Sequence, residues 1–283
     1  MKRFQSSLEG KCGIVTGGTT GFGYAIVKSL TEQKANVAVF SIDDPTAETL
    51  AGIEAVKRGN VAFIKKDVLA TGASEAMVDE TLHLYGKLDF LIINAGFAIR
   101  FEESLLETPI DKIEESLARQ FAIFPTAFTT LTLAAARVMA PRYEHLKPYS
   151  TGHRPDSGAV VVTLSEASLC PLRDDLLAYS AAKKATQWSM QSLAASLGPR
   201  NIRVNGIAPG FANTAKPRLF YSRYPLIRED VESRCHLKPA FMDPEAVVPA
   251  VIYLLTDNYV TGVTIPLDGG YGIDMKRYFQ ESM

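Results

Sequence analysis

Tyr179 and Lys183 have the side chains and the spacing of an acid/base pair. They stand four residues apart in the segment YSAAK, within a stretch of helical pattern, so both side chains fall on one helix face. A free tyrosine has a pKa of about 10 and is a poor base at neutral pH, but a neighbouring ammonium group stabilises the phenolate. We therefore predict that Lys183 lowers the pKa of Tyr179. The phenol could then exchange a proton with a carbonyl or an alcohol while a hydride moves.

The segment TGGTTGFG at residues 16–23 has the composition of a phosphate-binding turn. It follows an apolar run and precedes a helical pattern. Glycines there allow a tight turn, and the free N–H groups and positive dipole of the following helix attract a pyrophosphate. The candidate contacts to the phosphates of a dinucleotide are Gly17, Thr19, Thr20, Gly21, Phe22 and Gly23.

Polar or small residues also end the next predicted strands. Asp67 and Val68 end the third strand, where a carboxylate could meet the adenine. Asn94, Ala95 and Gly96 end the fourth, where small residues let a cofactor lie against the backbone. Because the carboxyl ends of parallel strands meet at one edge of a sheet, these residues predict a single crevice for a nicotinamide dinucleotide.

The end of the second predicted strand bears on the choice between NAD and NADP. An acidic residue there holds the ribose hydroxyls and repels a 2′-phosphate, whereas an arginine favours that phosphate. The two deciding positions are Ser41 and Ile42, and Asp43 and Asp44 follow them. Since the two aspartates disfavour an additional phosphate, the sequence leans towards NAD.

Alternating strands and helices must position these residues. Short, continuously apolar runs, typical of parallel strands covered on both faces, alternate with longer helical patterns. The predicted strands are residues 13–16, 37–40, 61–64, 88–93, 160–164, 204–207 and 263–267. The predicted helices are residues 23–33, 46–57, 74–84, 111–139, 179–197 and 244–256. This alternation predicts an α/β fold, a doubly wound, Rossmann-like parallel sheet of seven strands, in one domain over residues 1–283.

Two irregular segments interrupt the alternation. Residues 212–242 follow the sixth strand on the ligand side, and we predict a lid there over an anionic or aromatic substrate; a solvated, mobile loop is the alternative. This segment holds basic and aromatic residues, among them Lys216, Arg218, Phe220, Tyr221, Arg223, Tyr224, Arg228 and Arg234. Residues 141–157 lead into the fifth strand and should face away from the cleft. Cys170 and Arg173 could reach the mouth of the pocket.

Composition limits the possible partners. The 283 residues carry a formal net charge of −1, which gives no reason to expect nucleic acid or an anionic membrane. No apolar run approaches the roughly 20 residues that span a bilayer, and the N-terminus lacks the apolar core of a signal peptide. Three separated cysteines predict free thiols in a reducing compartment, without a metal site. We therefore expect a cytoplasmic protein that binds a small molecule.

Taken together, these motifs resemble the short-chain dehydrogenase/reductase family in its compact form, over nearly the whole chain. The matching segments are TGxxxGxG at 16–23, Asp67-Val68, NAG at 94–96, YxxxK at 179–183, VNGIAPG at 204–210 and DGGY at 268–271. The resemblance implies an NAD(P)-dependent oxidoreductase in which Pro209, Gly210 and Thr214 flank the nicotinamide. It also implies a homodimer or homotetramer, formed partly through the helix of Tyr179.

Two catalytic positions depart from the family pattern. The family has a serine after the fifth strand that holds the substrate oxygen, and a gap-free count back from Tyr179 reaches Glu166, with Ser165 one residue earlier. The family asparagine that organises a relay water falls on Gln120. Either a one-residue slip gives Ser165 the role of the serine, which we favour because loops absorb single insertions, or Glu166 faces inward as a second acid/base whose pKa burial raises.

Three functions follow from these observations. The first is an active dehydrogenase or reductase of a small carbonyl or alcohol, centred on Tyr179 and Lys183. The second is an epimerase- or dehydratase-like enzyme on the same fold that uses Glu166. The third is a catalytically silent nucleotide-binding protein, suggested by the departures at the serine and asparagine positions.

Overall fold

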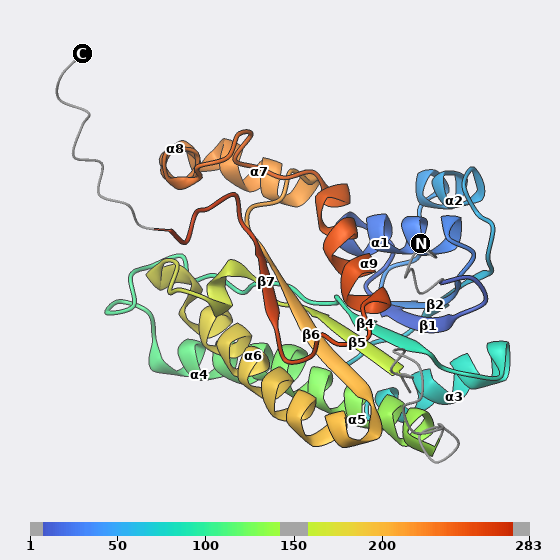
Figure 1. Ribbon diagram of the computed structural model, residues 1–283. Coiled ribbons are helices and arrows are strands. Elements are labelled where there is room, and N and C mark those ends of the chain that lie inside the picture. Colours follow the sequence, from blue (N-terminus) through green and yellow to red (C-terminus); the bar gives the residue numbers. More distant parts are fainter. Residues whose placement is uncertain (1–7, 142–157, 274–283) are drawn as a thin grey trace.

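A parallel sheet forms the centre of the computed structural model, which describes residues 8–141 and 158–273. Within these residues, seven strands pair in the order β3-β2-β1-β4-β5-β6-β7 (Figure 1). Strands are added outward in both directions from β1, so the direction of winding reverses between β1 and β4. A crevice for a ligand forms at such a reversal, beyond the carboxyl ends of the strands. The predicted doubly wound sheet is confirmed.

The strands are nearly as the apolar runs predicted. Their bounds are β1 (Cys12–Thr16), β2 (Asn36–Ser41), β3 (Val61–Lys65), β4 (Phe90–Ile93), β5 (Gly158–Thr163), β6 (Ile202–Pro209) and β7 (Thr264–Leu267). The five inner strands are almost wholly buried, whereas the edge strands β3 and β7 are partly exposed. Burial on both faces explains why the inner strands are continuously apolar instead of alternating.

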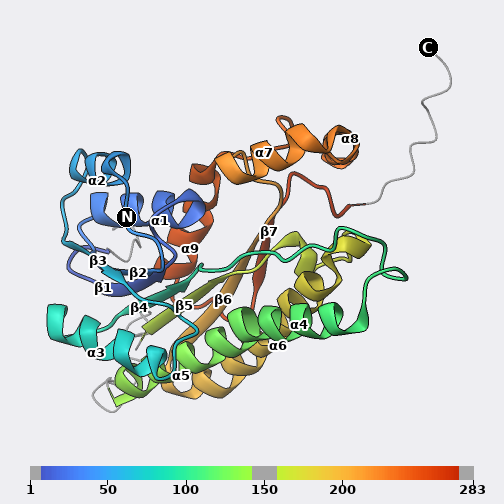
Figure 2. The same cartoon turned by 180° about the vertical axis from the view of Figure 1, so that it is seen from behind.

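Helices cover both faces of the sheet. The helices α3 (Ala73–Tyr85), α4 (Ile110–Phe121), α5 (Ala127–Met139) and α6 (Leu177–Leu197) lie on one face, and α1 (Gly21–Glu32), α2 (Ala47–Glu54) and α9 (Val248–Thr256) on the other, as opposite views agree (Figures 1 and 2). Short 3-10 turns precede or follow some of them: η3 (Glu166–Ser168), η4 (Asp174–Leu176), η5 (Gly198–Arg200) and η6 (Pro244–Val247).

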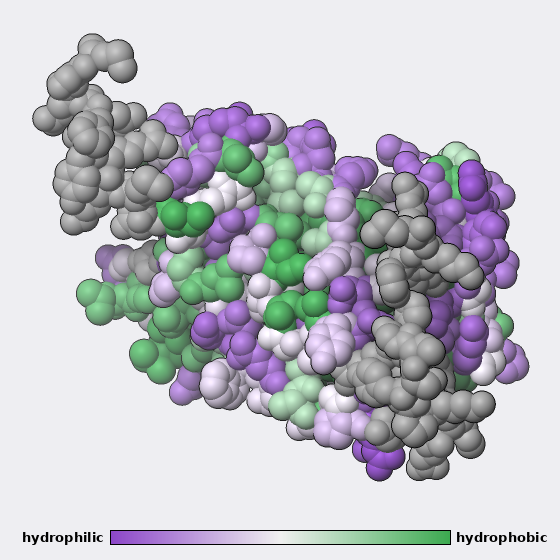
Figure 3. Space-filling model, viewed as in Figure 1, coloured by the Kyte–Doolittle hydropathy of each residue, from purple (hydrophilic) through white to green (hydrophobic). Residues whose placement is uncertain are grey.

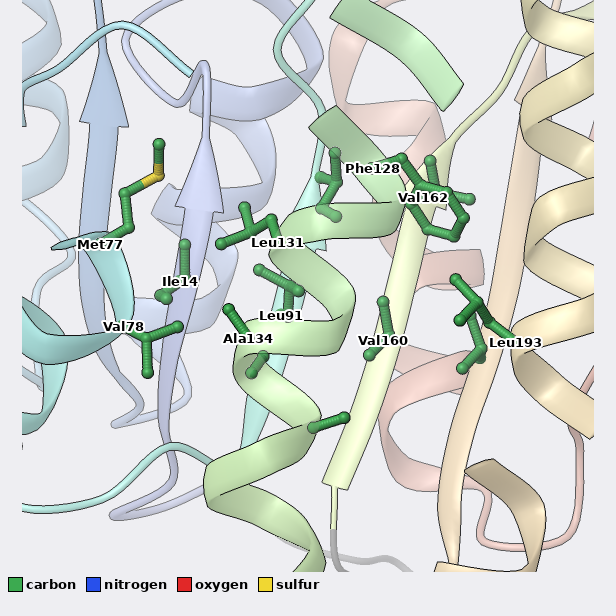
Figure 4. Close-up of a cluster of buried hydrophobic side chains, with 14 of the residues drawn as sticks. Ile14, Met77, Val78, Leu91, Phe128, Leu131, Ala134, Val160, Val162 and Leu193 are labelled. Carbon is green, nitrogen blue, oxygen red and sulfur yellow. The ribbon is translucent and has the colours of Figure 1, made fainter. Parts of the chain in front are cut away.

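Two apolar cores separate the helices from the sheet. On the α3–α6 side, Leu131 and Ala134 of α5 face the strand residues Ile14, Leu91 and Val160 (Figure 4). The other core joins the second face of the same strands to α1, α2 and α9. Because neighbouring residues of a strand point to opposite faces, each inner strand supplies both cores, and this fixes the strand ends that bear the site.

The helix predicted at residues 111–139 is interrupted in the structure. Between α4 and α5 the chain forms one π-helical stretch, η1 (Ala122–Thr126), which contains Pro125. Proline has no backbone N–H, so it cannot complete the regular hydrogen-bond ladder of an α-helix, and a π turn accommodates one additional residue. The buried side chain of Phe124 lies in this stretch.

By length and composition, the continuous stretch Ile110–Met139 is also apolar enough to cross a membrane. Its apolar residues Phe128 and Leu131, however, pack on the sheet with 1% and 3% of their surface exposed. A core helix of an α/β fold meets the same criterion of length and composition.

The segment 212–242 contains two helices, α7 (Ala215–Arg223) and α8 (Pro225–Arg234), which follow β6. They lie beyond the carboxyl ends of the strands, beside the end of β7 (Figure 1). Their outer surface is mostly hydrophilic (Figure 3). The segment predicted at 141–157 lies outside the described residues, apart from residue 141.

Candidate active site

The turn between β1 and α1 has a backbone that only glycine accommodates. Gly17 and Gly21 have φ values of +66° and +56°, in the left-handed region that disfavours other residues. A Cβ atom on Gly23 would lie 2.1 Å from the carbonyl oxygen of Gly17. The close approach brings the turn against the first residues of α1, whose free N–H groups then point out of the helix end.

Asn94 fastens this turn to the end of β4. Its Nδ2 donates to the carbonyl oxygen of Gly17 at 3.0 Å, and its Oδ1 accepts from Thr163 Oγ1 at 3.2 Å. Thr16 Oγ1 accepts the backbone N–H groups of both Asn94 and Ala95 at 3.1 Å. These bonds join the ends of β1, β4 and β5, so the crevice between them has a rigid floor.

A cleft of about 720 Å³ runs along these strand ends. All the residues predicted to contact a cofactor line it, except Gly23, which instead packs against the carbonyl oxygen of Gly17 and so lets the turn approach α1. The lining residues among those predicted are Gly17, Thr19, Thr20, Gly21, Phe22, Ser41, Ile42, Asp67, Val68, Asn94, Ala95, Gly96, Tyr179, Lys183, Pro209, Gly210 and Thr214. A glycine-rich turn, a helix N-terminus and an elongated cleft together fit a dinucleotide.

At the end of the cleft near β2, hydroxyl groups hold the backbone. Ser41 Oγ lies 3.2 Å from Thr19 Oγ1 and accepts the backbone N–H of Asp43 at 3.3 Å. The carboxylate of Asp67 accepts the backbone N–H of Leu69 at 2.9 Å. Ile42 lines the cleft and is 58% exposed, so its side chain is available to a bound ribose.

Tyr179 and Lys183 lie on α6 at the other end of the cleft. Lys183 Nζ donates to the carbonyl oxygen of Thr163 at 2.8 Å and stands 3.9 Å from the ring centroid of Phe124. The ring of Tyr179 packs edge-on against that of Phe124, with centroids 5.4 Å apart. The Ser165 hydroxyl lies near the phenol of Tyr179 and lowers its pKa. The aromatic ring of the π-helical stretch therefore packs against both candidate catalytic groups, and Lys183 Nζ also stands 5.7 Å from the ring centroid of Tyr179.

The prediction that Lys183 lowers the pKa of Tyr179 is wrong for this structure. Burial raises the pKa of Tyr179, and the opposing contributions come from the Ser165 hydroxyl and the positive charge of Arg100. Burial also lowers the pKa of Lys183 to about 7, so that its amine is only partly charged near neutral pH. Lys183 directs its ammonium to Thr163 and Phe124 instead of the phenol.

The structure separates Ser165 from Glu166. Ser165 lines the cleft beside Tyr179, and its hydroxyl also accepts the backbone N–H of Ala167 at the start of η3. Glu166 does not line the cleft; it is 1% exposed and its Oε1 accepts a hydrogen bond from Cys170 Sγ at 3.6 Å. Of the two alternatives, the less favoured one, in which Glu166 points inward beside Tyr179, is therefore wrong, because η3 directs its side chain away from the cleft.

Glu166 instead lies in a buried polar cluster behind η3. Burial and the negative charge of Asp268 raise its pKa to about 7. Its Oε2 has no hydrogen-bond partner within the described part of the chain. Asp268 accepts the backbone N–H groups of Gly270 and Gly272 at 2.9 and 3.1 Å, which holds the chain after β7 next to η3.

Gln120, at the position of the family asparagine, is fully buried near the end of α4. Its Nε2 donates to the carbonyl oxygen of Phe97 at 3.1 Å, and its Oε1 has no partner among the described residues. Gln120 does not line the cleft. Its one hydrogen bond among the described residues supports the chain after β4, and neither Tyr179 nor Lys183 is its partner.

Basic residues near Tyr179 come from outside the predicted lid. Arg218, Arg223 and Arg228 on α7 and α8 are exposed and do not line the cleft. The guanidinium of Arg100, in the connection between β4 and α4, instead stacks on Phe220 of α7 with its carbon 3.8 Å from the ring centroid. The lid segment thus contributes an aromatic ring where the sequence had suggested a cation.

Other contacts in the cleft had no signal in the sequence. Phe124, Thr163 and Lys66 line it although they belong to none of the motifs. The lining position of Phe124 follows from the π-helical stretch, which a helical periodicity does not reveal. Thr163 contributes through its backbone carbonyl, which any residue could supply.

Known proteins match this chain over most of its length. A family model described as enoyl-(acyl carrier protein) reductase matches residues 17–272. The chain is 31% identical to (+)-borneol dehydrogenase 1 of Salvia officinalis over 94% of its own length and 95% of that protein. It is 29% identical to a short-chain dehydrogenase/reductase of Aspergillus oryzae, over 94% and 97% of the two chains.

Solved structures share the whole fold. A putative short-chain alcohol dehydrogenase from Sinorhizobium meliloti superimposes with a TM-score of 0.80 at 26% identity, over 95% of this chain and all of that one. A short-chain type dehydrogenase/reductase from Mycobacterium marinum gives a TM-score of 0.75 at 24% identity, over 95% and 97% of the two chains.

Proposed function

The chain belongs to the short-chain dehydrogenase/reductase family, and we propose that Tyr179, Ser165 and Lys183 catalyse its NAD(P)-dependent oxidoreduction of a small carbonyl or alcohol. One observation supports these roles most directly: Ser165 and Tyr179 line the same cleft, and the Ser165 hydroxyl lowers the pKa of the Tyr179 phenol. Two adjacent hydroxyl groups at the end of a dinucleotide-sized cleft can both reach one substrate oxygen.

When bound, the nicotinamide cofactor supplies or accepts the hydride. In the reducing direction Tyr179 donates its proton to the substrate oxygen, and Ser165 donates a hydrogen bond to the same atom. Burial raises the pKa of Tyr179 and so keeps the phenol protonated before reaction, as an acid must be. In the oxidising direction the phenol oxygen takes the proton from the alcohol.

Lys183 would hold the cofactor ribose and supply positive charge near the phenolate. Its pKa of about 7 allows the amine to gain or lose a proton near neutral pH, so it can restore the proton that Tyr179 gives away. Its bond to Thr163 and the ring of Phe124 hold the amine at the end of the cleft. We assign Gln120 a supporting role beneath the chain that follows β4.

We further propose NAD over NADP as the cofactor. Ile42 occupies the exposed position where an arginine would bind a 2′-phosphate, and Asp43 beside it lines the cleft with negative charge. Lys66 also lines the cleft, which weakens this preference without reversing it. Titration of the purified protein with NADH and with NADPH, followed by nicotinamide fluorescence, measures the ratio of the two dissociation constants.

The remaining partners are proposals of the same kind. The substrate is a small molecule, which we propose to be anionic or aromatic. The near-neutral charge supports the expectation of no nucleic-acid or membrane partner. The three separated cysteines support a cytoplasmic location. The 72% exposure of Trp188, on the same helix as the exposed Ala181, supports a homodimer or homotetramer formed through α6.

A matched set of variants tests the catalytic roles. The purified protein is given reduced cofactor and a panel of ketones and aldehydes, and turnover is followed at the absorbance band of the reduced nicotinamide. Tyr179→Phe should keep cofactor affinity and lose turnover by about a hundredfold or more. Ser165→Ala should lose turnover while Glu166→Gln keeps it. Full turnover of Tyr179→Phe, or of Ser165→Ala, would contradict the assignment.

A further inference from the structure

Two arginines meet one aspartate, Asp175, which stands four residues before Tyr179. None of the three side chains lines the cleft itself; Arg100 lines an adjoining pocket, which shares Arg119 with the cleft and also contains Glu102, Glu103 and Glu115. Arg100, between β4 and α4, donates from Nη1 to Asp175 Oδ2 at 3.1 Å. Arg173, between η3 and η4, donates to both oxygens of the same carboxylate at 2.9 and 3.1 Å. The arginine side chains remain 31% and 27% exposed. Among these three side chains, two positive charges face one negative charge, so one positive charge is left over.

Arg100 lies near Tyr179, because the aspartate that it binds stands directly before the helix that carries Tyr179. The charge of Arg100 lowers the pKa of Tyr179, opposing the effect of burial, and both arginines lower the pKa of Tyr221. Electrostatic influence of this kind requires proximity, because water screens charges at longer range. The backbone N–H of Phe101 donates to the carbonyl oxygen of Asp175 at 3.1 Å, which joins the two connecting segments that carry the arginines.

The guanidinium groups are held in place before any ligand binds. The carbon of the Arg100 guanidinium stands 3.8 Å from the ring centroid of Phe220, and that of Arg173 stands 5.8 Å from it. Phe220 packs edge-on against Tyr221, with centroids 5.2 Å apart. Phe220 covers one face of the Arg100 guanidinium and Asp175 binds one edge of it. The side chain is therefore already ordered, and binding a ligand loses little additional side-chain entropy.

The remaining donors match a carboxylate. An arginine has five N–H groups in a planar fork that binds carboxylates in a bidentate manner. Arg100 uses only one of its nitrogens for Asp175 in the described part of the chain. The aromatic residues Phe220 and Tyr221 beside the arginines offer an apolar wall for the carbon part of a substrate.

On the basis of the proposed function, we infer that the substrate is a small keto acid or the corresponding hydroxy acid, whose carboxylate is bound by Arg100 with the support of Arg173. The carbonyl of the same molecule then lies at Ser165 and Tyr179. The carboxylate is not changed by the reaction; it positions the carbonyl and selects the substrate.

Paired substrates that differ only in charge test this inference. Pyruvate, acetoacetate and levulinate place a carboxylate at increasing distance from the carbonyl, and the methyl ester of each removes the charge. We expect kcat/KM for at least one acid to exceed that for its ester by about tenfold or more. In Arg100→Gln, kcat/KM for that acid should fall by about 10- to 100-fold, as for the loss of a charged hydrogen bond, while the value for the ester should change little.

Three further variants make the result specific. Arg173→Gln should weaken the preference for the acid in the same direction, and Arg100→Lys should restore part of it. Arg228→Gln, an exposed residue of α8, removes the same charge from the lid segment and should leave the preference unchanged. Equal kcat/KM values for every acid and its ester, or an equal loss for both in Arg100→Gln, would overturn the inference and leave the arginines a structural role beneath α7.

Binding measurements separate this inference from the proposed function. Calorimetric titration of the cofactor-loaded protein with each keto acid should show affinity in the wild type that Arg100→Gln loses. If keto acids bind to the wild type but not to Arg100→Gln, and no carbonyl compound is turned over, the proposed catalysis is wrong and the carboxylate site at Arg100 is supported. If neutral ketones are turned over and no keto acid binds in preference to its ester, the anion site fails alone.

Discussion

Replacing Glu166 by glutamine removes the one buried carboxyl group of η3 and should change how stability depends on pH. Burial and the charge of Asp268 raise the pKa of Glu166 from 4.5 to about 7 in the folded chain. The folded state therefore binds this proton more tightly than the unfolded state does. The stabilisation is complete below the unfolded pKa of 4.5 and is lost as the pH rises through the folded value of about 7.

The size of the effect follows from the shift. Each unit of pKa difference corresponds to about 1.4 kcal/mol, so the shift at Glu166 makes the fold about 3 kcal/mol less stable above neutral pH than in acid. Glutamine has nearly the same shape and does not titrate. The difference in free energy of unfolding between Glu166→Gln and wild type should therefore increase with pH, in favour of the variant, by about 2.5 kcal/mol between about pH 5 and about pH 8.

Urea unfolding followed by circular dichroism measures this difference. All other titrating groups are common to both proteins, so they cancel in the comparison. Glu229→Gln, which changes an exposed side chain of α8 in the same way, is the control for the replacement of a carboxyl group by an amide. A difference for Glu166→Gln that stays constant within about 0.5 kcal/mol over the same range would refute the reasoning, because it would mean that the buried carboxyl titrates as in water.

Further expectations concern the cofactor and the lysine. Gly23→Ala places a Cβ 2.1 Å from the carbonyl oxygen of Gly17, so the affinity for NADH in a fluorescence titration should fall by about tenfold or more. Gly198→Ala is the control, because nothing lies near its Cβ. Unchanged NADH affinity of Gly23→Ala would contradict the close approach of the turn to α1. Lys183→Met should lower turnover by about a hundredfold while circular dichroism stays that of wild type; turnover within about threefold of wild type would exclude a catalytic amine. Ile42→Arg adds a cation at a 58% exposed position and should raise the affinity for NADPH relative to NADH by about tenfold, and a ratio that does not move would show that the ribose lies elsewhere.

The order of elements and most of the cleft could be predicted from the sequence because they depend on local patterns. A strand buried on both faces needs a continuous apolar run, and the turn at Gly17 and Gly21 needs glycine because of its positive φ values. Both requirements restrict which residue types can occupy these positions, so both can be recognised in the sequence. The strand ends then fall at one edge by topology alone, which is why the predicted cofactor residues gather along one cleft.

The choice between Ser165 and Glu166 needed the backbone. Counting back from Tyr179 assumes that the connection after β5 has the usual length. In the structure Ser165 is the N-cap of η3 and lines the cleft, whereas Glu166 does not line it. The direction of the Glu166 side chain follows from that turn. A spacing rule cannot tell which of two adjacent residues meets a tyrosine when the intervening loop changes length.

The electrostatics of the site depended on contacts between distant segments. Arg100 and Arg173 are 73 positions apart and carry no motif, yet one aspartate brings them together. The pKa of Lys183 is set by its burial, which depends on Phe124 and on the carbonyl of Thr163. Neither burial nor ion pairing across such separations can be read from the two residues concerned.

The π-helical stretch η1 also sets the phase between the two halves of the long helix. One residue turns an α-helix by about 100°, so an additional residue in the wider turn rotates everything after it with respect to everything before it. That rotation lets Phe124 face Lys183 while Leu131, further along, still faces the sheet. Deleting one residue between 122 and 126 would restore regular α-helical hydrogen bonds. The chain would then lose either the contact of Phe124 with Lys183 or the packing of Leu131 on the sheet.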